Sequence, residues 1–119
     1  MRTLLLSGGI LLVATLAWAG TPLKVTLSPR VSTAPARLVV EAFVEPNAEN
    51  RALRVEADSG NYFRSSEEAL DGENAKPTHP VVFADLPAGS YEVTVVLQGT
   101  KGVRAVVHRL CTVMAAGGE

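Results

Sequence analysis

The sequence contains few of the residue types on which several classes of protein depend. Its 119 residues include one cysteine and two histidines, and aromatic side chains make up 5% of the chain. A single cysteine cannot form an internal disulfide, so we expect packing alone to stabilise the fold. The formal net charge is −1, with both signs interspersed, which argues against a surface for nucleic acid or for an anionic membrane.

Long apolar runs are also lacking, apart from one near the start of the chain. This run covers residues 4–16, follows one positive charge at Arg2, and ends before an Ala-x-Ala site whose last residue is Ala19. A membrane span needs about 20 apolar residues, whereas this run is shorter and contains a Ser-Gly-Gly interruption. We interpret residues 1–19 as a signal peptide. The mature protein is then predicted to be periplasmic or secreted, with no membrane span after cleavage.

Helical periodicity is nearly absent from the rest of the chain, and alternation with a period of two dominates. Such alternation predicts strands with one buried face. We predict seven strands, at residues 23–28, 38–45, 53–58, 62–66, 81–83, 90–98 and 103–114. Because crossover helices are missing, a parallel sheet is disfavoured. The predicted fold class is all-β, an antiparallel two-sheet sandwich of about seven strands over residues 20–114, with a flexible tail at residues 115–119.

A polar segment separates the fourth and fifth predicted strands. Residues 67–80 contain Gly72, Pro77 and Pro80, which interrupt regular structure, so we predict a loop. Its side chains include five with the oxygen atoms that bind Ca²⁺: Glu67, Glu68, Asp71, Glu73 and Asn74. They lack the Asp-x-Asp-x-Asp-Gly spacing of a dedicated calcium loop. We therefore interpret the segment as a solvated acidic loop.

The clearest strand lies within LPAGSYEVTVVLQGTKG, residues 86–102. Pro87 and Gly89 favour a turn, because proline presets its own φ at about −65° and glycine tolerates a positive φ. The strand that follows has Tyr91, Val93, Val95 and Leu97 on one face, and Glu92, Thr94, Val96 and Gln98 on the other. We predict that the first set is buried between two sheets.

This region, extended to FADLPAGSYEVTVVLQGTKG, resembles the late hairpin of immunoglobulin-like and fibronectin type III-like domains of exported bacterial proteins. As a second choice it is similar to the carboxypeptidase-regulatory-like, prealbumin-type sandwich, in which a Leu-Pro-x-Gly-x-Tyr sequence leads into a strand. The first resemblance implies an immunoglobulin-like sandwich with a structural corner, in which a tyrosine bonds back to the preceding loop. Tyr91 is the residue at that position. The resemblance implies a fold without implying an activity.

Motifs for catalysis and cofactor binding are lacking as well. There is no Gly-x-Ser-x-Gly, no Walker sequence and no Gly-rich dinucleotide loop. Cys111 and His108 are the one nucleophile and base to consider, but three residues apart on a regular strand they face opposite sides unless a bulge at Val106-Val107 intervenes. Zinc bound by His79 and His108 would need further ligands. We predict no enzyme, no catalytic or metal-ligating residue and no cofactor, and we interpret Cys111 as a buried small hydrophobe.

Binding is the function class that the sequence favours. Tyr62, Phe63 and Arg64 follow a tight turn, and aromatic side chains with arginine are enriched at interface cores. Alternation buries only one of the two rings; the other is available to a protein or glycan partner, or else covers the sheet edge. The predicted function is a noncatalytic exported binding or structural module that presents loops and a sheet face or edge. The alternatives are an accessory subunit of a secreted or envelope assembly and a small hydrolase-like enzyme.

Overall fold

The computed structural model describes residues 21–117. The predicted signal peptide at 1–19 lies outside this part of the chain, as do residues 118 and 119 of the predicted tail. The described part forms eight strands and one short 3-10 helix: β1 (Leu23–Ser28), β2 (Val31–Thr33), β3 (Ala36–Val44), β4 (Asn50–Asp58), β5 (Phe63–Ala69), η1 (Gly72–Asn74), β6 (Thr78–Leu86), β7 (Gly89–Gly99) and β8 (Gly102–Met114). No helix within residues 21–117 is long and apolar enough to cross a membrane.

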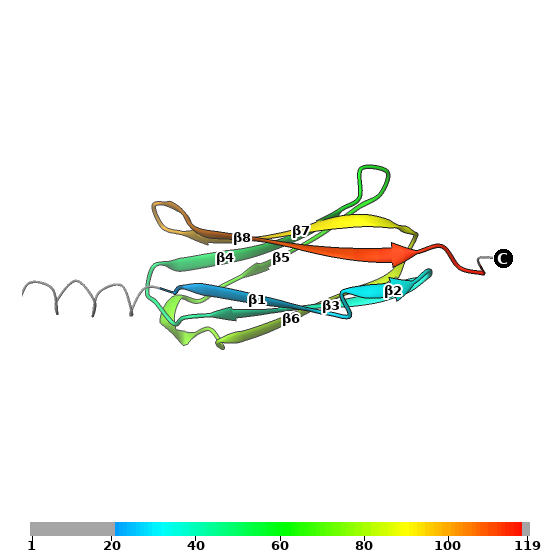
Figure 1. Ribbon diagram of the computed structural model, residues 1–119. Helices are drawn as coiled ribbons and strands as arrows, with labels where there is room; N and C mark the ends of the chain where they lie inside the picture. Colours follow the sequence, from blue (N-terminus) through cyan, green and yellow to red (C-terminus); the bar gives the residue numbers. More distant parts are fainter. Residues whose placement is uncertain (1–20, 118–119) are drawn as a thin grey trace, which may run out of the picture.

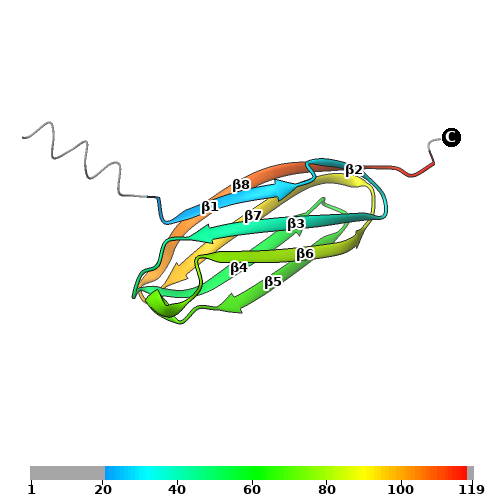
Figure 2. The same cartoon turned by 90° about the horizontal axis from the view of Figure 1, so that it is seen from below.

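The strands form two sheets that lie face to face (Figure 1). The smaller sheet has the order β1-β3-β6, and the larger has the order β2-β8-β7-β4-β5. Figure 2 shows the smaller sheet lying over the larger one. Paired strands are antiparallel except β2, which runs parallel to the end of β8. The predicted all-β architecture with two sheets is therefore confirmed.

The apolar interior between the sheets comes from alternate residues of the strands. Its inward faces include Leu23 and Val25 of β1, Leu38, Val40, Ala42 and Val44 of β3, Leu53, Val55 and Ala57 of β4, and Tyr91, Val93, Val95 and Leu97 of β7. These are the faces that the two-residue period predicts. Their burial contributes about 25 cal/mol per Å² of apolar surface removed from water. A domain without an internal disulfide depends on this contribution for its stability.

The strand β7 occupies the middle of the larger sheet, between β4 and β8. Its outward Val96 is only 7% exposed, although the sequence predicts that residue on the opposite face from the core. In the ladder, Val96 lies between Arg54 of β4 and Val106 of β8. Side chains directly opposite each other on a sheet face are close neighbours, and this cover removes Val96 from water.

The structure differs most from the predicted strands at two places. Residues 31–33 form β2, where the sequence predicts a loop, because three residues are too few to show alternation. The predicted loop at 67–80 is also shorter than expected. Pairing of Ala69 with Ala52 extends β5, and pairing of Thr78 with Phe43 extends β6. Polar side chains are compatible with these strands, since an antiparallel sheet can expose one face to water.

The connection from β5 to β6 crosses from one sheet to the other. Each of these strands is an edge of its own sheet, and residues 70–77 join them. Leu70 is buried in the core, which anchors the connection. Gly72, at the start of η1, has φ +52°, a left-handed conformation that glycine adopts without steric cost. We call the two edges together with this connection the β5–β6 seam.

Candidate functional site

A cavity of about 440 Å³ lies at the end of the β5–β6 seam, where the connection leaves β5 and enters β6. One continuous stretch of chain supplies the whole lining: Glu68, Ala69, Asp71, Ala75, Lys76, Thr78, His79 and Pro80. Small-molecule sites typically have volumes of about 300–1,000 Å³. The cavity therefore has room for a small ligand, and its lining combines backbone of two strands with charged side chains.

His79 is the buried polar residue of this lining. It pairs with Ala42 in the ladder, which places the imidazole on the core side of β6, and the residue is 6% exposed. Its Nδ1 lies 3.1 Å from Oε2 of Glu68 on β5, so the contact joins the edges of the two sheets. A carboxylate oxygen only accepts hydrogen bonds, and this geometry therefore assigns the ring proton to Nδ1.

The other ring nitrogen of His79, Nε2, is buried and has no hydrogen-bond partner among the described residues. With the proton on Nδ1, Nε2 presents a lone pair. A buried acceptor left without a partner costs about 1–3 kcal/mol. Because almost none of the surface of Nε2 is accessible to water, a ligand reaches this atom only if a neighbouring group moves. A carboxylate on one nitrogen fixes the tautomer and the ring orientation, which prepares the other nitrogen to accept a proton.

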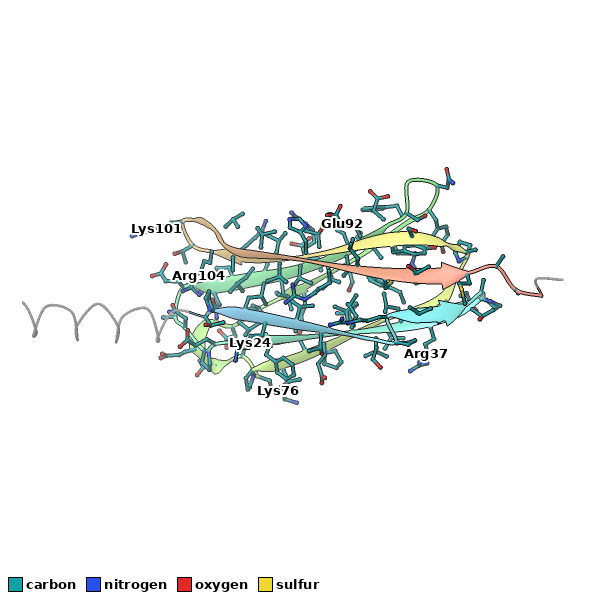
Figure 3. The ribbon with its side chains drawn as sticks, viewed as in Figure 1. Lys24, Arg37, Lys76, Glu92, Lys101 and Arg104 are labelled. Atoms are coloured by element: carbon teal, nitrogen blue, oxygen red, sulfur yellow. The ribbon has the colours of Figure 1, made fainter. Side chains whose placement is uncertain are left out.

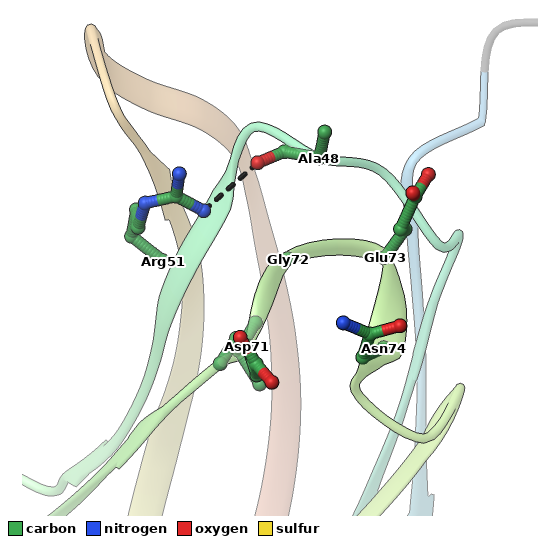
Figure 4. Close-up of a pocket in the computed structure, with 7 residues that line it drawn as sticks. Ala48, Arg51, Asp71, Gly72, Glu73 and Asn74 are labelled. Atoms are coloured by element: carbon green, nitrogen blue, oxygen red, sulfur yellow. Dashed lines mark hydrogen bonds between the residues drawn. The ribbon is translucent and has the colours of Figure 1, made fainter.

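Asp71 and Lys76 bring opposite charges to the same cavity. Both are exposed, and the ion pairs of the described residues include neither. Lys76 projects from the lower margin of the molecule in Figure 3. Asp71 also lines a neighbouring hollow of about 320 Å³ (Figure 4). Arg51 in that hollow is directed elsewhere, because its Nη1 donates to the carbonyl oxygens of Ala48 and Asn50 at 2.8 and 2.7 Å.

The predicted partner-binding residues lie at the start of β5 and just before it. The Tyr62 ring is half-buried against the core, whereas Phe63 is 54% exposed. Arg64 crosses the β5–β6 seam: its guanidinium lies 5.5 Å from the centroid of the Phe83 ring, and its Nη1 donates to the carbonyl oxygen of Ala84 at 3.2 Å. Binding of a protein or glycan partner at these residues stays a prediction.

The predicted corner residue Tyr91 is 1% exposed. Its hydroxyl donates to the carbonyl oxygen of Pro87 at 2.7 Å, four residues earlier. Burial raises the pKa of Tyr91 above its ordinary value of 10.0. The bond holds the turn at Pro87 against the start of β7, so this side chain has a structural role.

Cys111 and His108 lie on opposite faces of β8. Cys111 is buried opposite Tyr91, and burial raises the pKa of its thiol. His108 is exposed, and its Nδ1 lies 3.4 Å from Oε2 of Glu92 and 3.2 Å from Oγ1 of Thr94. The register between β7 and β8 is regular at Val106-Val107, so no bulge there turns the two residues to one face.

The five acidic and amide residues of the predicted acidic loop fall on several elements rather than on one loop. Glu67 and Glu68 belong to β5, Asp71 precedes η1, and Glu73 and Asn74 lie within it. Across residues 21–117, no three or more histidine, cysteine, aspartate or glutamate side chains are placed to hold one metal ion. Of this set, Glu68 and Asp71 line the cavity with His79.

The pairing of Glu68 with His79 is not among the contacts that the sequence predicts. The sequence suggests His79 only as a zinc ligand together with His108, and the two histidines lie on different sheets. The available signal was period two: His79, Val81 and Phe83 are alternate residues, and extending that face backward from the predicted strand places the imidazole inward. Nothing in the sequence specifies that β5 and β6 are the edges that meet.

No family model and no curated protein sequence matches the chain. Solved structures do resemble it. A superoxide reductase (neelaredoxin) from Ignicoccus hospitalis has a TM-score of 0.63 and 15% identity over 78% of this chain and 80% of that one. A variant of that enzyme gives 0.63 and 14% over 82% and 85%. A family 76 glycoside hydrolase from a bovine Bacteroides thetaiotaomicron strain gives 0.54 and 16% over 76% of this chain and 20% of that chain.

These neighbours correct four expectations from the sequence. The resemblance to immunoglobulin-like, fibronectin type III-like or prealbumin-type domains is wrong, because the structural neighbours are superoxide reductases. A turn followed by an alternating strand is a local signal that many β folds share. The same finding corrects three further assignments: a noncatalytic module or accessory subunit, a non-enzyme, and a protein-binding domain. The likeness itself, at these identities, establishes the fold alone.

Proposed function

We propose that the cavity in the β5–β6 seam is a small-molecule active site in which His79, oriented by Glu68, accepts a proton from the bound ligand. The observation that carries this proposal is a buried Nε2 without a partner, on an imidazole whose other nitrogen contacts a carboxylate. The proposal is supported by a fold that the chain has in common with enzymes. It concerns this chain's own residues and takes no substrate from those enzymes.

The chemistry is that of a general base. When Nε2 takes a proton from an O–H or N–H group of the ligand, that bond breaks, its electron pair stays on the ligand, and an Nε2–H bond forms. The ring becomes an imidazolium, which the Glu68 carboxylate, 3.1 Å from Nδ1, stabilises. Return of the proton restores His79 for the next ligand.

The neighbours' names state that they reduce superoxide, and we do not assign that activity to this chain. Side chains of histidine and cysteine are the usual ligands of redox-active transition metals. In residues 21–117 these are His79, His108 and Cys111. His79 lies at the seam, His108 on the outer face of β8, and Cys111 on the buried face of β8. The three do not face one another, so they do not fit a common redox centre.

Four small compounds test whether the cavity binds a ligand: L-serine, L-alanine, ethanolamine and 3-hydroxypropionate. Each is titrated into the protein while the Cε1–H signals of its two histidines are followed by NMR. We expect at least one compound to shift the His79 signal in a saturable way and to leave His108 unchanged. The variant His108→Gln assigns the two signals. If none of the four gives a saturable shift at His79, the proposed site is wrong.

We also propose that the chain is exported to the periplasm or beyond. The proposal rests on the sequence of residues 1–19, with one charge, a short apolar run and an Ala-x-Ala site. Mass spectrometry of the protein recovered from the periplasm of an expressing bacterium is expected to give a chain that begins at Gly20. A full-length chain confined to the cytoplasm would contradict it.

A further inference from the structure

We propose that the protein forms a symmetric dimer, in which the free edge of β8 pairs with the same edge of a second copy of this chain. Only the end of β8, from Thr112 to Met114, is covered on that edge by β2. Figure 2 shows β8 along the upper margin of the molecule. This edge lies on the opposite side of the larger sheet from β5, so the inference is independent of the function proposed for the seam cavity.

The pairing with β2 identifies the backbone groups of β8 that face this edge. The N–H of Thr112 donates to the carbonyl oxygen of Arg30, just before β2, at 2.8 Å. Alternate residues of a strand direct their backbone groups to the same side. The N–H and C=O groups of Val106, His108 and Leu110 therefore face the same edge as those of Thr112. No strand within residues 21–117 pairs with them there.

The side chains along the open part of β8 are apolar and exposed. Leu110 is 74% exposed and Val106 is 46% exposed, and the strand contains neither proline nor lysine. Natural proteins usually protect a long edge strand with such residues, because an open apolar edge pairs readily with another strand. The other edge of the larger sheet, β5, carries the charged side chains of Glu67 and Glu68. The edge that is suited to pairing is therefore that of β8.

The open stretch of β8 is centred on His108. It begins after Arg104, which is the extra residue of a bulge in the pairing with β7, and it ends at Cys111, where pairing with β2 is about to begin. An antiparallel partner strand can therefore use residues 105–111. When the partner is the same stretch of a second copy, a two-fold axis at His108 brings the whole of both stretches into register.

This register places apolar side chains opposite each other. Val106 lies opposite Leu110 of the second copy, and the two-fold axis repeats the contact. Val96 of β7 lies beside Val106 within each chain, so an apolar row continues from one sheet into the other. Side chains directly opposite each other on a sheet face are close neighbours, and the exposed surfaces of Val106 and Leu110 would be covered by this pairing.

The same register is compatible with the charges of β8. Arg109 lies opposite Val107 of the second copy, so the two arginines do not oppose each other. The two His108 side chains meet at the axis. Nδ1 of His108 lies 3.4 Å from Oε2 of Glu92 in its own chain, and this carboxylate offsets the charge of a protonated ring.

The size of the interface predicts a reversible dimer. Three facing residues on each chain form about six backbone hydrogen bonds, because each hydrogen-bonded pair of an antiparallel ladder exchanges two. At one hydrogen bond per 100–200 Å², this number corresponds to a buried area of about 600–1,200 Å². Interfaces of that size belong to weak complexes. We therefore expect the monomer and the dimer to coexist, with the dimer favoured at high protein concentration.

Sedimentation equilibrium of the purified protein and of two variants tests the dimer. Leu110→Lys places a charge opposite Val106 twice in each dimer and is expected to raise the dissociation constant at least about tenfold. The matched control is Met114→Lys, on the same strand and 52% exposed, where β2 already covers the edge. This variant is expected to dimerise like the wild type. Both side chains are exposed, so thermal denaturation should show unchanged folding.

Amide hydrogen exchange, followed by NMR, tests the register. The amides of Val106, His108 and Leu110 are expected to exchange fast at low protein concentration and more slowly as the dimer forms. In Leu110→Lys the exchange at Val106 and His108 should stay fast at every concentration. The amide of Thr112, which already donates to Arg30, serves as the internal control and should not depend on concentration.

The outcomes decide between this dimer and other forms of the protein. A dimer that Leu110→Lys weakens and Met114→Lys leaves intact, with slowed exchange at the three amides, supports the inference. A protein that stays monomeric up to about 1 mM, the limit of a weak specific complex, overturns it. Oligomers larger than a dimer, or slowed exchange along β5 or β6 in place of β8, overturn it as well.

Discussion

Two polar groups inside the sandwich differ in how the fold satisfies them. The hydroxyl of Tyr91 has a partner in the carbonyl oxygen of Pro87, whereas Nε2 of His79 has none among the described residues. Buried polar groups in native proteins are almost always hydrogen-bonded. At the scale of single residues, Tyr91 is therefore explained by the fold, whereas for His79 we propose a partner outside the chain.

The first prediction at this scale concerns the Tyr91 hydroxyl. Tyr91→Phe keeps the ring in the core and leaves the Pro87 carbonyl without its donor, which is expected to lower the free energy of unfolding by about 1 kcal/mol. Urea denaturation measures the change. The control is Tyr62→Phe, which removes a hydroxyl from a half-buried ring and leaves the Pro87 carbonyl paired. Equal losses in the two variants would contradict a specific role for the bond.

The second prediction concerns the thiol of Cys111. Burial raises its pKa above the ordinary value of 9.0, so the folded chain keeps the thiol proton at a pH where the unfolded chain has released it. The corresponding stability is complete below pH 9.0 and is lost as the pH rises above it. We expect the native thiol to react slowly with a thiol reagent at pH 8, and urea-unfolded protein to react fast. Equal rates would place the thiol in water.

At the scale of secondary-structure elements, the connection between β5 and β6 depends on Gly72. Its φ is +52°, and a Cβ there would lie 3.3 Å from the carbonyl oxygen of Ala48. We expect Gly72→Ala to destabilise the fold by more than about 1 kcal/mol, from backbone strain plus this contact. Gly60→Ala is the control, because Gly60 has φ +90° but a Cβ there meets nothing within 4 Å. A smaller loss for Gly72→Ala than for Gly60→Ala in urea denaturation would contradict the account.

The elements differ in how well their sequence predicts them. Alternation in β3, β4 and β7 identifies the buried faces, because each of these strands has neighbours on both sides and one face in the core. The strand β2 has three residues and is formed by pairing with the distant end of β8, so local pattern cannot reveal it. The ends of β5 and β6 belong to edge strands whose outer faces meet water. Their side chains are therefore polar, and the sequence predicts a loop there instead of strands.

At the scale of the whole molecule, the site arises from the meeting of two sheet edges. Glu68 and His79 both lie within residues 67–80, which the sequence predicts as one solvated loop, and the sequence assigns neither of them a role in a site. The contact between them follows from β5 ending one sheet and β6 ending the other. The sequence predicts the two layers, whereas the strand order that creates the seam depends on pairing between residues far apart in the chain.

The protonation of the His79 ring tests the central claim most directly. Long-range ¹H–¹⁵N NMR of the imidazole distinguishes a ring protonated at Nδ1 from one protonated at Nε2. At a pH where the ring is neutral, the account predicts a proton on Nδ1, donated to Glu68, and a free lone pair on Nε2. The variant Glu68→Ala should let the ring sample both tautomers. A neutral ring with its proton on Nε2 in the wild-type protein would contradict the proposed base and the site built around it.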